Sequence, residues 1–356
     1  MIDISIFRIV IALIAIVCFF FLFNLLKHRR IIGSEFLIWS SLLFLIIFLS
    51  IFPSTIRIIF NYISLSSDSR YDRLIQLGYL FSFSSLAIIF YYRSKIHLHR
   101  EQFIRSVQIP ILEGFISENI KKIGKLDLVI LIPAYNEEGT IHEVIKRIPK
   151  RICGFEPFIL VVSDGSDDST ISKAQKAGAY VVDHPINFGQ CVAYRTGYMI
   201  ANKMDAKFLI HLDADGQYKP EEIEQILKPL VEGDSDLVSG SRKLGYYEEE
   251  YKLSNLPRSI GVIFFNYLLT ILLGIKITDS ASGFRAIKAD FLPMLTLKQE
   301  QFHSSELLIE SIKIGARFKE VPVSFLGRQS GLTKKPKSVR YAFGFINAII
   351  RTWMRN

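Results

Sequence analysis

The chain contains the segment Phe208-Leu209-Ile210-His211-Leu212-Asp213-Ala214-Asp215-Gly216-Gln217, an apolar run that ends in two carboxylates one residue apart. The apolar run is typical of a buried β-strand. Because side chains at positions i and i+2 of a strand point to the same side, Asp213 and Asp215 can converge on one divalent cation. That arrangement suits a metal-bound diphosphate. An isolated Asp-x-Asp pair is also common in solvated turns, so the neighbouring sequence decides the interpretation.

Strands and helices alternate around this segment. Further buried strands are predicted where short apolar runs occur, at 128–132, 158–162, 180–182 and 237–239. Helices are expected to follow these runs, beginning near Thr140, Ser169, Gln190 and Pro220. Thr140 and Glu143 have the spacing of a capping box. This alternation predicts an α/β fold with a mostly parallel sheet.

Acidic residues follow three of the predicted strands. They are Glu137 and Glu138 after the first, Asp164, Asp167 and Asp168 after the second, and the Asp213 and Asp215 pair. Ligands of open parallel sheets bind beyond the carboxyl ends of the strands. Three acidic groups at one sheet edge exceed what solvation of the loops requires, so we predict a nucleotide and metal site there.

The N-terminal part of the chain has a different character. Half of the 356 residues are hydrophobic, and apolar runs at 9–26, 36–52 and 77–92 approach the length of a membrane span. The third run contains three serines and suits either a span or an amphipathic segment in the membrane interface. Basic residues at 27–30 and 93–105 place both flanks in the cytoplasm by the positive-inside rule. We therefore expect a multi-pass protein of the cell membrane whose remaining chain is cytoplasmic.

Charge and cysteine content exclude other classes. The formal net charge is +9, but the basic residues are spread out, which favours anionic lipids or a phosphorylated substrate over nucleic acid. The three cysteines lack metal-ligand spacing, so we expect neither a disulfide framework nor a zinc site.

Several motifs in chain order resemble a known family. Segments 132–138 (Ile-Pro-Ala-Tyr-Asn-Glu-Glu), 162–170 and 213–217 are similar to family 2 glycosyltransferases of the GT-A fold. Segments 279–284 and 328–334 resemble the dolichol-phosphate mannose synthase branch, whose members transfer a sugar from a nucleotide donor to a polyprenyl phosphate. The resemblance covers roughly residues 126–340. It implies a membrane-anchored polyprenyl-phosphate hexosyltransferase that acts on an undecaprenyl or dolichyl phosphate.

The resemblance also implies roles for individual residues. It assigns donor binding to Pro133, Tyr135, Glu137, Val162, Asp164, Asp213, Ala214, Asp215, Gln217, Arg328 and Lys334. Within that set, Asp213, Asp215 and Gln217 are expected to hold Mg²⁺ or Mn²⁺. The acceptor phosphate is assigned to Arg242, Arg258 and Ser282, and the catalytic residues to Asp213, Asp215, Arg242 and Arg258. The family usually has two aspartates where this chain has Ser163-Asp164, which leaves the choice between a GDP-linked and a UDP-linked sugar open.

The expected chemistry is a single inverting displacement. A phosphomonoester acceptor is already an anionic nucleophile near neutral pH, so no dedicated base is needed. The metal and its aspartates would stabilise the leaving nucleoside diphosphate, and the arginines would offset the repulsion between the two phosphates.

These expectations give a domain plan. A transmembrane region of about three helices (1–95) is followed by a helical connector (96–125), a GT-A domain (126–335) and a C-terminal amphipathic helix (336–356). Within the GT-A domain, 258–275 is expected to be a helix in the membrane interface. Alternatives are transfer directly to a glycan or protein, a processive polysaccharide synthase, an inactive membrane scaffold of the same fold, and a metal-dependent phosphatase. The oligomeric state, including a homo-oligomer, is left open.

Overall fold

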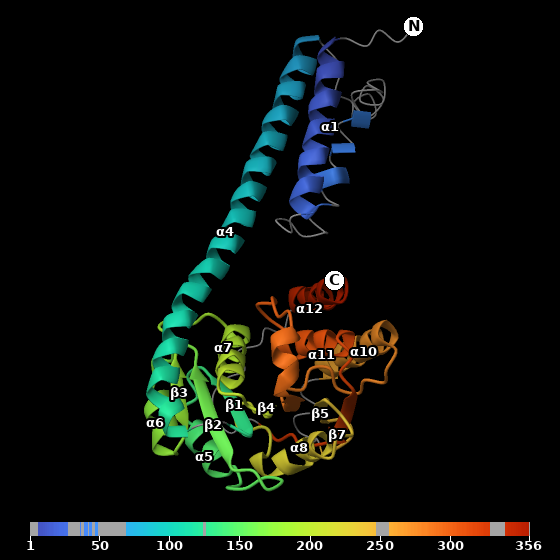
Figure 1. Ribbon diagram of the computed structural model, residues 1–356. Coiled ribbons are helices and arrows are strands. Elements are labelled where there is room, and N and C mark those ends of the chain that lie inside the picture. The colour runs from blue at the N-terminus through green and yellow to red at the C-terminus, as the bar shows by residue number, and fades with distance from the viewer. Residues whose placement is uncertain are drawn as a thin grey trace. The chain divides into compact units, whose positions relative to one another are not determined.

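A computed structural model describes residues 6–27, 36, 39–41, 43–44, 47–48, 69–123, 126–246, 256–327 and 339–355 (Figure 1). The chain divides into two compact units, Met1–Phe103 and Ile104–Asn356. The predicted boundary between membrane region and connector, at 95/96, lies near this division.

The first unit contains α1 (Ile6–Lys27) and the beginning of α4 (Ser69–Ile123). Large apolar side chains of α1 are exposed, among them Val17, Phe20 and Phe21. Among the helices of the described residues, none has both the length and the apolarity that a bilayer crossing requires. The structure therefore does not support the three predicted spans, and most of the second one, 36–52, lies outside the described residues.

The second unit is built on one sheet, which contains seven strands within the described residues (Figure 1). Their order across the sheet is β3-β2-β1-β4-β6-β5-β7. Only β6 among these strands runs antiparallel to its neighbours. The strands are β1 (Leu128–Ala134), β2 (Pro157–Ser163), β3 (Tyr180–Asp183), β4 (Phe208–His211), β5 (Leu237–Ser241), β6 (Arg285–Lys288) and β7 (Phe318–Pro322). The predicted mixed α/β architecture with a mostly parallel sheet is confirmed.

Helices occupy the connections where they were predicted. The sheet is accompanied by α5 (Ile141–Lys146), α6 (Thr170–Lys176), α7 (Gln190–Lys203), the short 3₁₀ helix η1 (Pro220–Glu222) and α8 (Ile223–Val231). Later in the chain follow α10 (Leu256–Leu273), the 3₁₀ helix η2 (Ala289–Met294), α11 (His303–Lys313) and α12 (Val339–Trp353). The helices α10 and α12 lie in the two segments for which interfacial helices were predicted.

One local prediction is wrong. Thr140 precedes α5, but its hydroxyl makes no capping hydrogen bond to the helix. It donates instead to the carbonyl of Ala214, at 2.8 Å. The Thr140 to Glu143 spacing satisfied the capping-box pattern, whereas the folded chain uses the hydroxyl to join the loop after β1 to the loop after β4.

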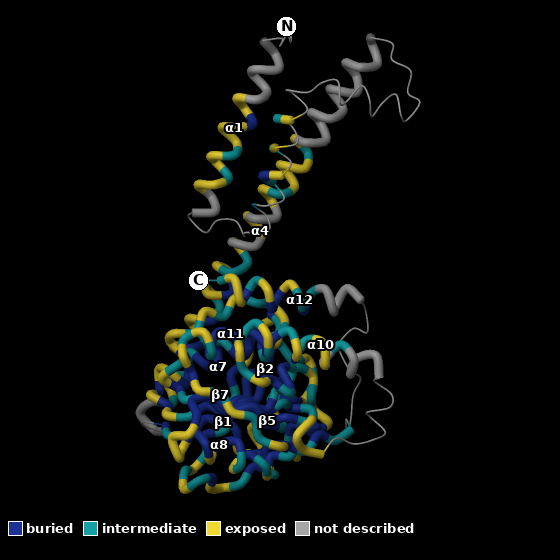
Figure 2. Tube along the Cα trace, turned by 90° about the vertical axis from the view of Figure 1, so that its right-hand side faces the viewer, coloured by how far each residue is buried: buried dark blue, intermediate teal, exposed yellow. Residues whose placement is uncertain are grey.

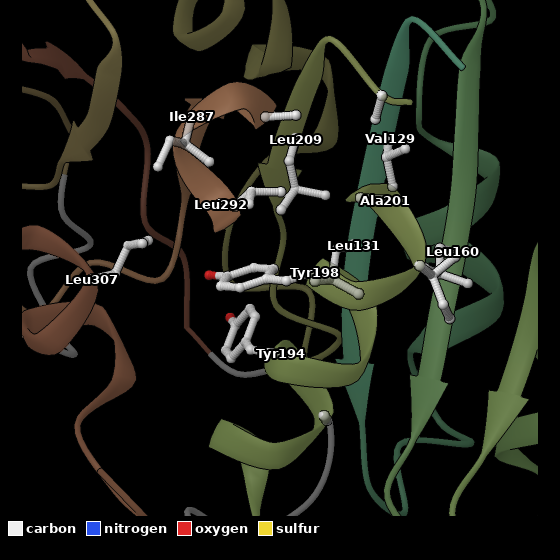
Figure 3. Close-up of a cluster of buried hydrophobic side chains, with 14 of the residues drawn as sticks. Val129, Leu131, Leu160, Tyr194, Tyr198, Ala201, Leu209, Ile287, Leu292 and Leu307 are labelled. Atoms are coloured by element: carbon white, nitrogen blue, oxygen red, sulfur yellow. The ribbon is translucent and has the colours of Figure 1, made fainter. Parts of the chain in front are cut away.

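Buried apolar side chains form two clusters, to which residues of the sheet contribute. The buried residues lie around the strands (Figure 2). Strand β1 shows the alternation directly: Val129 and Leu131 belong to one buried cluster, and Ile130 belongs to the other. Figure 3 shows the first cluster, in which Leu131 and Leu160 pack with residues of α7. At Gly197 of α7 a Cβ would lie 2.3 Å from Leu131, so the absence of a side chain allows this helix to approach β1 closely.

Candidate active site

The candidate site lies where the parallel strands β1, β2 and β4 end. Ala134 pairs with Ser163, and Leu131 with His211, so the loops that follow these strands share one edge of the sheet. The bond from Thr140 to Ala214 joins two of these loops. The structure thus brings together the three acidic groups that the sequence placed at one edge.

The loops after β1 and β2 are joined by hydrogen bonds from main-chain N–H groups to side-chain oxygens. Asn136, in the left-handed region with φ +52°, donates its N–H to Ser166 Oγ and accepts from Asp167 N at 2.9 Å. The N–H of Glu137 donates to Thr170 Oγ1 at 2.9 Å. Tyr135 and Glu137 are half-buried at this edge. Their predicted contacts with a nucleoside stay predictions.

Pro133 and Val162, also assigned to the donor, are buried within paired strands. The side chain of Val162 belongs to the core cluster. Only the main chain of these two positions is thus suited to contact a ligand, because their side chains face protein.

Asp164 has a structural task that the sequence did not reveal. Its carboxylate is buried and accepts hydrogen bonds from His184 Nδ1 at 2.8 Å, Phe188 N at 3.0 Å and Gly189 N at 2.7 Å. Both oxygens therefore hold the segment 184–189 against the end of β2. A direct contact of Asp164 with base or ribose stays a prediction.

Asp213 and Asp215 follow β4 and are both half-buried. A Cβ on Gly283 would lie 2.4 Å from Asp213 Oδ2, so the main chain at Gly283 passes directly beside this carboxylate. Tyr194 donates a long hydrogen bond, 3.5 Å, to Asp213 Oδ1. Burial raises the pKa of Tyr194, as does the Asp213 charge, so its hydroxyl remains a donor. Asp215 accepts from the N–H of Gln217 at 3.2 Å.

The donor set fits a hard divalent cation that also binds a diphosphate. Within the described residues, no group of three or more His, Cys, Asp or Glu side chains is placed to hold a metal ion by itself. Mg²⁺ is commonly bound by one or two carboxylates together with waters and substrate phosphates. Because Gly283 has no side chain, its main chain can lie against Asp213 without displacing this carboxylate. Gln217, the third predicted ligand, donates its amide to the carbonyl of Leu326 at 3.1 Å.

We expect Gly283→Ala to lower the affinity for Mn²⁺ and nucleoside diphosphate by about 10- to 100-fold, as changes beside metal ligands commonly do. The added methyl would displace the Asp213 carboxylate. Titration calorimetry with UDP and GDP in the presence of Mn²⁺ measures the effect. Gly114→Ala is the matched control, because a Cβ there meets nothing within 4 Å. Equal affinities in both variants would contradict the placement of the metal.

A buried aromatic cluster supports the loop after β4. The hydroxyl of Tyr198 lies 2.8 Å from His211 Nε2 and 2.6 Å from His303 Nε2. The ring of Tyr194 stacks on His303 with 4.1 Å between centroids. Figure 3 shows both tyrosines beside the aliphatic side chains of the core. The side chain that orients Asp213 is therefore itself held by this cluster.

Burial keeps both histidines of the cluster neutral. It lowers the pKa of His211 to about 3 and that of His303 well below the ordinary value, and Arg285 acts in the same direction on both. Below about pH 6.5 these histidines bind protons in the unfolded chain, where the His pKa is near 6.5, but not in the folded chain. The free energy of unfolding is thus unaffected by these groups above about pH 6.5 and falls below it, by about 1.4 kcal/mol per pH unit for each histidine.

We therefore expect His303→Gln to flatten the decline in unfolding free energy between about pH 6.5 and 5. Urea unfolding followed by circular dichroism at several pH values measures this slope. The exposed His142 is the matched control: His142→Gln should leave the slope at the wild-type value. A His303→Gln slope as steep as the wild type would show that His303 does not cause it.

Arg242 and Asp279 form a largely buried ion pair, and Asp279 belongs to the same segment, 279–284, as Gly283. Arg242 donates Nε and Nη2 to Asp279 at 2.6 and 2.7 Å, and its own N–H to the same carboxylate at 3.1 Å. Its guanidinium also lies over the ring of Phe325, 5.0 Å from the centroid. Asp279 thereby fixes the plane of the guanidinium. No role was predicted for Asp279 or Gly283 individually, although both lie in the 279–284 motif.

Of the four remaining predicted residues, the structure describes the side chain of one. Ser282 is fully buried, with its hydroxyl 3.2 Å from Tyr218 Oη, so it anchors the turn beside Gly283. Arg258 lies in α10, but its side chain is outside the described residues, as are Arg328 and Lys334. Their predicted phosphate contacts stay predictions.

Comparison with known proteins identifies the family. Residues 129–293 match Glycosyl transferase family 2. The uncharacterized protein MJ1222 of Methanocaldococcus jannaschii is 33% identical over 223 residues, which cover 61% of this chain and 89% of that protein. A dolichyl-phosphate hexose transferase of Haloferax volcanii is 31% identical over 209 residues, 58% of this chain and 86% of the relative.

A solved structure supports the fold. Glucosyl-3-phosphoglycerate synthase from Mycobacterium tuberculosis, crystallised with Mn²⁺, UDP and glucosyl-3-phosphoglycerate, superposes with a TM-score of 0.52 at 19% identity. The likeness covers 69% of this chain and 84% of that one. With the acidic sheet edge and the extent of the sequence matches, these comparisons show that the chain belongs to glycosyl transferase family 2.

Proposed function

We propose that this protein transfers a hexose from a nucleotide sugar to a polyprenyl phosphate at the cytoplasmic face of a membrane, with inversion at the anomeric carbon. The observation that carries the proposal is the contact between Gly283 and Asp213. Gly283 belongs to the 279–284 segment, whose Asp279 binds Arg242. One short segment thus contacts both Asp213, suited to a metal and diphosphate, and Arg242, suited to an acceptor phosphate.

The donor end rests on Asp213 and Asp215. A divalent cation bound there would stabilise the charge that develops on the leaving diphosphate. Tyr194 and Gly283 contact Asp213 and so orient its carboxylate. The solved relative that holds Mn²⁺ and UDP has the same fold, which is consistent with such a ligand.

The acceptor end rests on Arg242. A guanidinium carries five N–H donors in one plane, and Asp279 accepts from two of its nitrogens. A group held in this way is oriented before the substrate arrives, so little entropy is lost on binding. The phosphate itself is the nucleophile: its oxygen forms the bond to the anomeric carbon while the bond to the nucleoside diphosphate breaks. The Haloferax relative, named as a dolichyl-phosphate hexose transferase, supports this acceptor class.

An apolar stripe on α10 suits a lipid acceptor. Ile263, Phe264, Tyr267 and Ile271 recur at helical spacing, and all four side chains are more than half exposed. Helix α12 packs beside α10, with 4.4 Å between the rings of Phe265 and Phe345. We propose that α10 and α12 lie in the membrane interface, and that the exposed apolar side chains of α1 anchor the protein.

The direct test is a short incubation of the purified full-length protein with radiolabelled nucleotide sugars, polyprenyl phosphate vesicles and Mn²⁺. The proposal expects label in an organic-extractable lipid that mild acid hydrolyses. Label only in polymer or protein would oppose it. The anomeric configuration of the product, determined by NMR, tests inversion, and a product that keeps the donor's configuration would refute the single displacement.

A further inference from the structure

A chain of buried hydrogen bonds leads from α4 to Asp164. Gln108 Nε2 lies 2.7 Å from Thr196 Oγ1, Thr196 Oγ1 lies 2.9 Å from His184 Nε2, and His184 Nδ1 lies 2.8 Å from Asp164 Oδ1. All four side chains are buried, with Gln108 only 4% exposed. Every residue of this chain, which we name the α4 relay, belongs to the second unit.

The groups at the two ends of the α4 relay determine which atom donates in each of its hydrogen bonds. The Asp164 carboxylate accepts from the N–H groups of Phe188 and Gly189, and Nδ1 of His184 donates to the same carboxylate. In the tautomer with its proton on Nδ1, Nε2 of His184 accepts, and the Thr196 hydroxyl donates to it. The amide nitrogen of Gln108 only donates, so it binds the oxygen of the same hydroxyl. The direction of each bond is thus set from Gln108 to Asp164.

Gln108 decides between two orientations of the Thr196 hydroxyl. This hydroxyl has a second acceptor within reach, the carbonyl of Val192 at 3.1 Å. Gln108 Nε2 also reaches that carbonyl, at 3.4 Å, and so supplies it with another donor. Without the Gln108 amide, the Thr196 hydroxyl can turn to Val192, and His184 Nε2 would be left buried and unpaired, which is costly.

The α4 relay ends on the segment that Asp164 holds. Gly165 has φ +71°, and a Cβ there would lie 2.5 Å from the carbonyl carbon of Ile186, so the loop after β2 rests directly on this segment. Ile104 of α4 packs against Phe188 and Val192 in a buried cluster. The helix therefore contacts the 184–189 segment directly through Ile104 and reaches its His184 through Gln108 and Thr196.

We propose that Gln108 is a positioning residue for the nucleoside end of the donor site, acting through Thr196 and His184 on Asp164 and the 184–189 segment. This inference rests on the proposed function, because it requires that the edge formed by the loops after β1 and β2 binds a nucleoside diphosphate. It assigns to α4 a part in donor recognition.

The test uses full-length protein and titration calorimetry with UDP and GDP in the presence of Mn²⁺. Gln108→Glu preserves shape but presents a group that accepts, which draws the Thr196 hydroxyl away from His184. Gln108→Leu removes the donor without adding a charge. Asn119→Leu is the matched control on the same helix, since the amide of Asn119 donates to the carbonyl of Phe115, one turn earlier in α4. Thermal unfolding is measured for each variant in parallel.

The expected result is a rise in the dissociation constant of about five- to tenfold in both Gln108 variants and none in the control. The KM for the donor should rise by a similar factor with kcat nearly constant. In a Thr196→Val background, Gln108→Leu should have no additional effect on binding, because the relay is already interrupted.

Two outcomes would overturn the inference. In the first, the wild-type protein binds a nucleoside diphosphate and the Gln108 variants bind it equally well. Gln108 would then be only a structural residue, whatever happens to thermal stability, and the proposed function would remain intact. Absence of binding by the wild-type protein would refute the proposed function and this inference together.

Discussion

Asp215→Asn should abolish sugar transfer while leaving the protein folded. The substitution retains size and the acceptor oxygen that faces Gln217 N, but it removes a charge that would bind the cation and so the stabilisation of the leaving diphosphate. We expect a loss of about 10²- to 10³-fold in the single-turnover rate, comparable with the loss of one electrostatic group from other active sites. Labelled donor and extraction of the lipid product measure it.

Asp234→Asn is the control for that experiment, because Asp234 forms an exposed ion pair with Lys319. Its transfer rate and circular dichroism should equal those of the wild type. Transfer at the wild-type rate in Asp215→Asn would contradict the assignment of the metal site. If wild-type protein also shows no transfer with any donor, an inactive scaffold of the same fold becomes the better interpretation.

Asp279→Asn should lower the free energy of unfolding by about 3 to 5 kcal/mol, because it leaves the partly buried Arg242 without its charged partner. Burial raises the pKa of Asp279, but the charge and hydrogen bonds of Arg242 outweigh it, so the carboxyl pKa lies below its usual value. The pair is therefore ionised at neutral pH. Urea unfolding at pH 7 measures the loss, and the surviving folded protein should also transfer sugar more slowly, since the guanidinium is no longer oriented.

Asp127→Asn provides the comparison, since Asp127 pairs with Lys207 at 2.6 Å on the surface. Exposed pairs contribute about 0 to 1 kcal/mol. If the two substitutions cost the same, the Arg242 and Asp279 pair contributes no more than a surface contact, and its role in holding the site would be wrong.

Strands β1, β2, β4 and β5 could be predicted because they are largely buried and so read as apolar runs. Strand β7, which is parallel to β5 but exposed or half-buried, was not predicted, and neither was β6. Strand β6 consists of Arg285, Ala286, Ile287 and Lys288, and Arg285 is fully buried, with its guanidinium donating to the carbonyls of Ser280 and Ser304. A buried charge is accepted only when such partners surround it, and those partners become neighbours only in the folded chain.

In the candidate site too, some positions follow from local sequence, whereas other roles depend on contacts that form only in the folded chain. The positions of Asp213 and Asp215 follow from local sequence, because a strand end and a two-residue spacing suffice. The tasks of Asp164 and Thr140 depend on partners distant in the chain. Asp164 accepts from Phe188 and Gly189, and Thr140 donates to Ala214. No spacing rule encodes such contacts. The capping-box spacing predicted a helix cap for Thr140, and the resemblance gave Asp164 only a donor-binding role, which stays a prediction.

The pairing of β5 with β6 has a consequence for how enzymes of this type diversify. These strands are antiparallel neighbours, with Ser239 opposite Arg285, so the chain leaves the sheet after β5 and returns at almost the same place. Residues 242–284, which include Arg242, α10 and Gly283, form an excursion from that pair. This segment is not independent of the loop after β4, because its Ser282 contacts Tyr218 and its Gly283 contacts Asp213. An exchange of the segment between relatives would therefore test the proposed separation of donor and acceptor ends only if Ser282 and Gly283 are kept.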